Sequence, residues 1–412
     1  MRDRLPDLNA FQGKLSEQQG ENLLQFFRLL DDLSQQVERL YAYAHMKRDQ
    51  DTRVSRYQAM HDRAFQLIVQ IQSAAAFANS EIMEIPEATL LQFQEYQPGL
   101  ALYRYKLSDL LRQKPHILSA EQEKLLARMG EIAHAPSNIF SMINDADMTF
   151  PVVHDEHGNP VRLTKGNFIT FLESGRRETR KEAFEALYRT YESHRNTLAA
   201  TLQASVKRDV IMARIRRFAT ALEAALFQDN IPVEVYENLI DAVHGHLSSF
   251  HRHLQLRQQL LAVKPLHMYD LYTPMVPTVQ RKFTYEEAVQ LVVDAVKPLG
   301  RQYQNDLKQG LQDRWVDVYE NEGKRGGAYS TAAYGVHPYV LMNFQGGIHD
   351  VFTLAHEMGH AMHSFYSNQS QPYVYADYSI FVAEVASTLN ESLLLHHMLQ
   401  STSDPKMRLY LL

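Results

Sequence analysis

Two histidines four residues apart, with a glutamate directly after the first, carry the strongest chemical signal in this sequence: His356, Glu357 and His360. Residues four apart lie on one face of an α-helix, so both imidazoles can reach one zinc ion while the glutamate lies beside them. A catalytic zinc site uses three protein ligands and leaves a position for water, whose pKa the metal lowers to about 7. We therefore predict a zinc ion bound by His356 and His360, with Glu357 taking the proton from that water as it attacks a carbonyl.

The residues around this motif are mostly apolar, which indicates a buried helix: Val351, Phe352, Leu354, Ala355, Met358, Ala361, Met362 and Phe365. Burying two histidines and a glutamate costs free energy, so their presence there favours a function. The alternatives are a helix whose polar residues face solvent and a chance match. The chain has 19 histidines, and chance alone would produce the motif in roughly one shuffled chain in twenty, so the motif is a hypothesis that its context strengthens.

Two residues compete to be the third ligand. His363 lies seven residues after His356, but seven helical residues rise about 10.5 Å, so we interpret it as a packing or ligand-supporting residue and keep it as the alternative ligand. Glu384 is the one carboxylate of the apolar stretch 378–388, and a lone buried carboxylate is costly unless it is paired or bound to metal. We predict Glu384 as the ligand, presented by a second helix, with an ordinary surface acid as the alternative.

The elements that must position these residues are mainly helical. Apolar residues recur at three- and four-residue spacing from Glu17 to about Ala135, and amphipathic helices resume from about Asn167. A hairpin is expected around residues 155–160, and two strands, Gly326–Thr331 and Tyr339–Phe344, precede the histidine helix. We predict a mostly α fold with a small β element before the active-site helix.

The change of pattern near Phe150 suggests a domain boundary. We predict an N-terminal helical lobe at 1–148 and a catalytic domain at 149–412.

The charge and the residue composition exclude several kinds of partner and of metal site. The formal net charge is −6, so the chain lacks the overall positive charge that favours binding to nucleic acid. The basic cluster Arg176, Arg177, Arg180 and Lys181 is interpreted as a solvated helix face. The absence of cysteine excludes disulfides and thiolate metal sites. No apolar run is long enough for a membrane span and no secretory signal is recognisable, so we expect no membrane association and a cytoplasmic location.

The sequence resembles the oligoendopeptidase F group of the thimet-oligopeptidase family of zinc endopeptidases. The resemblance is carried by Gly323–Tyr329, Leu354–Ser364 and Gln371–Glu391, with support upstream from Thr197–Ala200 and His267–Leu271. It extends over essentially the whole chain. It implies a two-lobed, zincin-type helical fold with a deep channel, and cleavage of internal bonds in short, unstructured peptides.

The resemblance also assigns zinc to His356, His360 and Glu384, and the general base to Glu357. The strand Tyr339–Phe344 would then be an edge along which substrate pairs, or a purely structural strand.

Family members continue beyond the third ligand and carry a histidine and tyrosines that stabilise the oxyanion, whereas this chain ends at Leu412. We therefore expect a form truncated at the C-terminus. Loss of one oxyanion donor typically costs about 10² to 10³ in rate. The alternative functions are a non-catalytic, peptide-binding form that keeps the metal site, and a helical scaffold whose motif is accidental.

Overall fold

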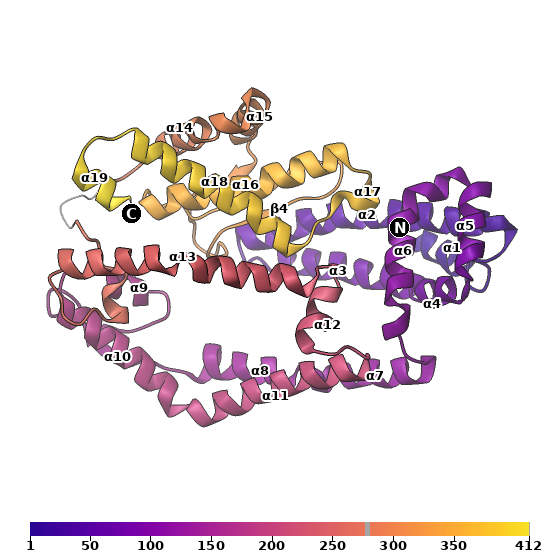
Figure 1. Cartoon of the computed structure of the whole chain (residues 1–412), viewed down its shortest axis with the longest axis horizontal. Helices are drawn as coiled ribbons and strands as arrows, with labels where there is room; N and C mark the ends of the chain where they lie inside the picture. Colours follow the sequence, from indigo (N-terminus) through magenta and orange to yellow (C-terminus); the bar gives the residue numbers. More distant parts are fainter. Residues whose placement is uncertain (277–280, 412) are drawn as a thin grey trace. The chain divides into compact units, whose positions relative to one another are not determined.

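The computed structural model describes residues 1–276 and 281–411, and regular structure in them is mostly α-helical, as predicted (Figure 1). The helices are α1 (Leu5–Asn9), α2 (Glu21–Gln50), α3 (Ser55–Ala75), α4 (Phe77–Glu84), α5 (Glu87–Tyr96), α6 (Arg104–Gln113), α7 (Ala120–Ala133), α8 (Ala135–Ser141), α9 (Phe168–Glu173), α10 (Arg177–Ser193), α11 (Arg195–Ile215), α12 (Ala221–Phe227), α13 (Val233–Leu260), α14 (Tyr285–Ala295), α15 (Arg301–Gln312), α16 (Ile348–Ser370), α17 (Tyr373–Ala376), α18 (Ile380–Gln400) and α19 (Pro405–Tyr410). The strands are β1 (Val152–His154), β2 (Pro160–Arg162), β3 (Val316–Asp317), β4 (Tyr329–Thr331) and β5 (Tyr339–Leu341).

The chain forms two compact units that interleave along the sequence. Unit 1 combines Met1–Lys114 with Gln280–Asp404, and unit 2 combines Pro115–Val279 with Pro405–Tyr410. Contacts within unit 1 thus join the first helices to the segment that carries the histidine motif. The predicted domains, 1–148 and 149–412, divide the chain differently and stay a prediction.

A three-stranded sheet in unit 1 lies against the histidine helix. β5 pairs with β3 in parallel and with β4 antiparallel, so that Val340 lies opposite both Val316 and Ser330. The sheet order is β3-β5-β4. The two predicted strands therefore pair as expected, but the interpretation of Tyr339–Phe344 as a substrate edge is wrong because β5 is paired on both sides. The two edges of this sheet are β3 and β4.

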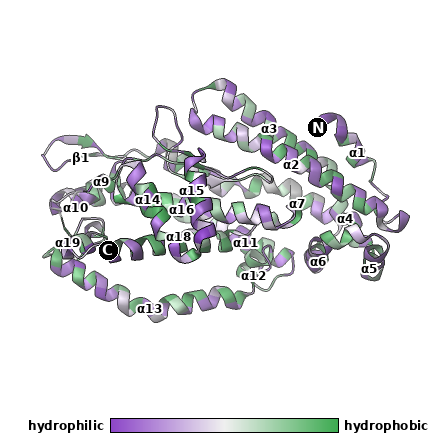
Figure 2. Cartoon of the chain, turned by 90° about the horizontal axis from the view of Figure 1, so that it is seen from above, coloured by the Kyte–Doolittle hydropathy of each residue, from purple (hydrophilic) through white to green (hydrophobic). Residues whose placement is uncertain are grey.

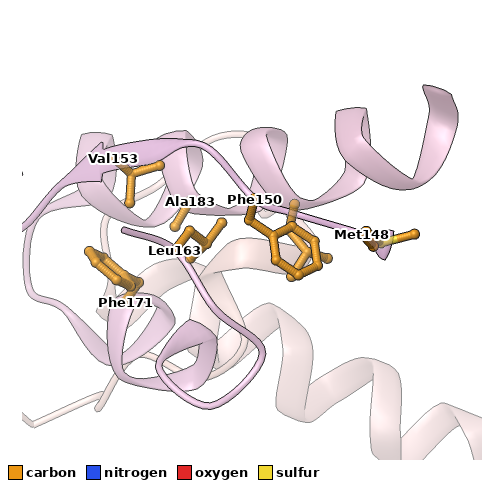
Figure 3. Packing of buried hydrophobic residues seen from close by; sticks show 7 residues of the cluster. Met148, Phe150, Val153, Leu163, Phe171 and Ala183 are labelled. Carbon is orange, nitrogen blue, oxygen red and sulfur yellow. The ribbon is translucent and has the colours of Figure 1, made fainter. Parts of the chain in front are cut away.

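Unit 2 contains the predicted hairpin, β1 with β2, in which Val153 lies opposite Val161. The carboxylate of Asp155 forms its turn by accepting from the backbone N–H groups of His157 and Asn159 at 2.9 and 2.8 Å. Beneath the hairpin a hydrophobic cluster joins it to α9 and α10 (Figure 3). The members of the cluster are Met148, Phe150, Val153, Leu163, Phe171, Ala183 and Leu187. Burial of these side chains stabilises the hairpin, which would be marginal alone.

A buried ion pair ties α10 to the segment that follows α13. Arg177 and Arg180 donate to the carboxylate of Asp270 at 2.9 and 2.8 Å. Asp270 is fully buried and the side chain of Arg180 is 3% exposed. The interpretation of this basic cluster as a solvated helix face is therefore wrong for Arg180.

The long helix α13 of unit 2 has no buried residue, and hydrophobic and hydrophilic residues alternate along it (Figure 2). None of the helices within the described ranges combines the length and apolar composition that a bilayer crossing requires.

Candidate metal centre

The helix α16 carries the histidine motif, and its start is defined by side-chain hydrogen bonds. The carboxylate of Asp350 accepts from the backbone N–H groups of Gly347 and Gln345 at 2.8 and 3.0 Å. These bonds satisfy donors that a helix start leaves free, and the acid also suits the positive end of the helix dipole. The apolar face predicted for this helix is buried: Val351, Leu354, Ala355, Met358, Ala361 and Met362 are at most 1% exposed.

Gly359 lets the second helix, α18, approach α16 closely. A Cβ at this position would lie 2.7 Å from the Cα of Ser387 and 2.8 Å from the carbonyl oxygen of Ala386. Such distances leave no room for a side chain. One helical turn toward the C-terminus of α18, Asn390 donates to the carbonyl oxygen of Ala355 at 3.3 Å. The crossing of the two helices therefore brings Glu384 to the histidine face of α16.

Three side-chain atoms converge at this crossing. The Nε2 atoms of His356 and His360 are 3.1 Å apart, and Oε2 of Glu384 lies 3.5 and 3.7 Å from them. A tetrahedral zinc ion with bonds of about 2.0–2.2 Å separates its ligand atoms by roughly 3.3–3.6 Å. Of the three distances, 3.5 Å lies inside this range and 3.1 and 3.7 Å lie within about 0.2 Å of it, so shifts of a few tenths of an ångström would seat such an ion. Across the part of the chain that the structure describes, this is the one group of three or more side chains with metal-ligating geometry.

Glu391 orients the first histidine. Its Oε1 lies 2.6 Å from Nδ1 of His356, so that Nδ1 carries the proton and the lone pair of Nε2 faces the other two ligand atoms. Ser387 supports Glu384 in the same way, by donating to its Oε2 at 2.8 Å. Neither support was predicted from the sequence, where Glu391 stood only among the residues of the resemblance. The signal was present in their spacing, since Ser387 and Glu391 follow Glu384 by three and seven residues on one helix face.

Glu384 reaches the site for a different reason from the one predicted. Its side chain is 47% exposed, and neighbours such as Ile380 and Val385 are 70% and 59% exposed. The argument from a carboxylate buried in an apolar stretch is therefore wrong. Its position depends on the helix crossing instead.

Glu357 is buried next to the ligands, with 8% of its surface exposed. Burial raises the pKa of its carboxyl to about 7; the charge of His356 opposes this shift and that of Glu384 adds to it. The backbone N–H of Ser330 on β4 also bonds to this carboxylate. A carboxyl whose pKa is near neutrality can both accept and return a proton, and a cation at the three ligands would lower the pKa again.

His363 lies outside the group of three. Its ring stacks on that of Tyr378, with centroids 3.7 Å apart and planes 13° apart. Its Nδ1 is buried, and no partner for it is found among the described residues. The structure therefore brings His356, His360, Glu384 and Glu357 together and places His363 against an aromatic ring.

Comparisons with known proteins bear on the whole chain. Residues 170–412 match the family described as "Peptidase family M3", and residues 81–150 match one described as "Oligopeptidase F". Oligopeptidase PepF of Bacillus subtilis is 46% identical over 412 residues, which are 100% of this chain and 61% of that protein. Group B oligopeptidase PepB of Streptococcus agalactiae is 39% identical over 99% of this chain and 68% of its own length.

A solved structure agrees with these matches. The crystal structure of oligoendopeptidase-F from Enterococcus faecium has 33% sequence identity and a TM-score of 0.70, over 100% of this chain and 68% of that one. The chain thus spans about three fifths of the length of the Bacillus subtilis relative. Because the M3 match covers more than half of the residues and includes the histidine helix and α18, the chain belongs to peptidase family M3.

Proposed function

We propose that this protein is a zinc-dependent endopeptidase that hydrolyses internal bonds of short peptides. The observation that carries the proposal is the convergence of two imidazole nitrogens and one carboxylate oxygen, 3.1–3.7 Å apart, beside a buried glutamate. His356, His360 and Glu384 would hold the metal, and Glu357 would be the base. When bound, zinc supplies a Lewis acid that polarises the scissile carbonyl and lowers the pKa of water.

The residues of this chain have separate tasks in the proposed reaction. Glu357 accepts a proton from the attacking water and then donates it to the nitrogen of the leaving peptide. Glu391 holds the imidazole of His356 in the tautomer that a ligand needs. The N–H of Ser330 fixes the carboxylate of Glu357 from the sheet side.

The substrate class follows from the family and from the sheet. The names of these relatives refer to oligopeptides, and a peptide in extended form can pair with an edge strand such as β4. Short peptides without fixed structure adopt that form at the smallest conformational cost. A cytoplasmic location stays a prediction from the sequence.

The test is metal analysis of the purified chain together with cleavage of a quenched peptide, with and without chelator. We expect one zinc per chain and cleavage that chelation stops and added zinc restores. Zinc without cleavage would instead favour the peptide-binding, non-catalytic alternative, which the limited coverage of the relatives keeps open. A chain without zinc would contradict both.

A further inference from the structure

A cavity of about 1050 Å³ lies in unit 1 beside the candidate metal centre. It is lined by parts of α2 and α6, by β4 and the segment after it, and by residues in the range 364–378. Two of its lining residues belong to the surroundings of the centre. Ser330 bonds to Glu357, and the hydroxyl of Tyr378 lies 2.6 Å from Ser364 while its ring stacks on His363. A peptide held at Glu357 would therefore extend into this cavity.

The lining is acidic and incompletely neutralised. Its carboxylates are those of Asp31, Glu38, Asp109 and Asp377. Asp109 is neutralised by Arg112, whose Nε lies 2.9 Å away. Within the described part of the chain, the other three accept hydrogen bonds from uncharged groups: Asp31 from Tyr103 at 2.7 Å, Glu38 from Tyr373, and Asp377 from the backbone N–H of Tyr378 at 2.9 Å. No ion pair joins any of these three to another described residue.

The nearby cations offset these charges only in part. Lys106, the one lysine of the lining, lies over the ring of Phe27 at 5.0 Å. Burial raises the pKa of Asp31, and the positive charge of Lys106 opposes this shift. Arg39 follows Glu38 in the sequence but donates to the carbonyl oxygen of Tyr334 at 2.8 Å. Burial raises the pKa of Glu38, and the charges of Asp377 and Asp31 add to this shift. The hydrogen bond from Tyr373 and the charge of Arg39 oppose it, but the pKa stays above its ordinary value.

Aromatic rings complete the lining. Six tyrosines contribute to it, at positions 41, 105, 334, 373, 375 and 378. The rings of Tyr334 and Tyr373 meet edge to face with centroids 5.5 Å apart. Carboxylates together with tyrosine faces are the combination that attracts an ammonium group, through charge and through the ring quadrupole.

We propose that Glu38 and Asp377 determine substrate preference by binding an ammonium group of the peptide in this cavity. The group is either the free N-terminus or a lysine side chain, which share this chemistry. The inference rests on the proposed function for its substrate class and adds the charge that the substrate must carry. A bound cation would relieve the repulsion between the two carboxylates, which gives such peptides their advantage.

The experiment measures peptide binding to the zinc-loaded Glu357→Gln chain, in which turnover is blocked. Four peptides of one sequence are compared: unmodified, N-acetylated, with norleucine in place of lysine, and with both changes. We expect removal of the recognised cation to weaken binding about tenfold, the lower range for a charge-assisted hydrogen bond. The change that has this effect, acetylation or norleucine, identifies the source of the ammonium.

Glu38→Gln in the same background should abolish this preference, because glutamine still accepts from the Tyr373 hydroxyl but lacks the charge. Asp377→Asn should reduce it. Glu95→Gln, at an exposed position of unit 1 outside the cavity, is the matched control and should keep it.

Equal affinity for all four peptides, no binding of any, or a preference that survives Glu38→Gln together with Asp377→Asn would each overturn the inference. If the preference is present but the chain with Glu357 intact cleaves nothing, the proposed hydrolysis fails and this inference stands.

Discussion

Glu357 is the residue on which the proposed chemistry depends, and Glu357→Gln tests it. Glutamine keeps the size of the side chain but cannot accept a proton. A positioned acid–base group contributes about 10² to 10⁴ in rate, so kcat for peptide cleavage should fall by at least that lower factor. Zinc content should not change, because the three ligand residues remain. Substantial cleavage by a zinc-loaded, uncontaminated variant would remove Glu357 from the mechanism.

The ligand assignments are tested by metal content alone, whatever the activity of the chain. His356→Ala and Glu384→Ala each remove one of three protein ligands, so we expect purified protein with much less than one zinc per chain. His363→Ala should retain most of its zinc, because its ring packs on Tyr378 instead of joining the group of three. Full zinc occupancy in Glu384→Ala would exclude Glu384 as a ligand. Loss of zinc in His363→Ala would favour His363 as the third ligand.

At the scale of elements, the contact between α16 and α18 determines the shape of the site. Gly359→Ala should destabilise the protein by about 1–3 kcal/mol, as overpacking does. It should also weaken zinc binding by about tenfold or more, because displacing α18 moves Glu384, Ser387 and Glu391 together. Chemical unfolding and competition with a chelator measure the two effects.

Gly245→Ala on α13 is the control for the same substitution. An added Cβ there meets no atom within 4 Å, so the higher helix propensity of alanine should stabilise the protein by about 0.5–1 kcal/mol. If the two variants behaved alike, the close approach at Gly359 would not govern the site.

At the scale of the whole molecule, long-range ion pairs hold distant segments of unit 2 together. Burial raises the pKa of Asp270, but the hydrogen bonds from Arg177 and Arg180 outweigh it and leave the pKa below its ordinary value. The folded state therefore binds the Asp270 proton more weakly than the unfolded chain does. The resulting stabilisation is complete above the unfolded pKa of about 3.9 and is lost as the pH falls through the lower, folded pKa.

Asp270→Asn should thus cost roughly 3 kcal/mol at pH 7, since it leaves two guanidinium groups without a buried anion. The difference from the unsubstituted protein should shrink below pH 4. Denaturant unfolding at several pH values measures it. Glu185→Gln on α10 breaks the exposed pairs with Arg189 and Lys181 and should change stability by less than about 0.5 kcal/mol. A pH-independent effect of Asp270→Asn would contradict the ionic origin.

What could be predicted from the sequence is what depends on local geometry. The i, i+4 spacing of His356 and His360 and the apolar face of their helix are properties of one helix, so the chain near them specifies both. The mostly helical fold follows in the same way from repeated three- and four-residue spacing. The predicted strands before α16 also pair with each other, because a hairpin joins neighbouring segments.

Only the tertiary structure decided the rest, because it depends on contacts between distant segments. The exposed Glu384 meets the histidines through a helix crossing that a missing Cβ at Gly359 permits, and no burial pattern could reveal it. The sheet order places β5 in the centre and makes β3 and β4 the edges, since β3 pairs with the side of β5 that the predicted pair of strands leaves open. Arg180 is buried because Asp270, ninety residues away, supplies its counter-ion. Local patterns thus determine which side chains can do chemistry, whereas long-range packing determines which of them meet.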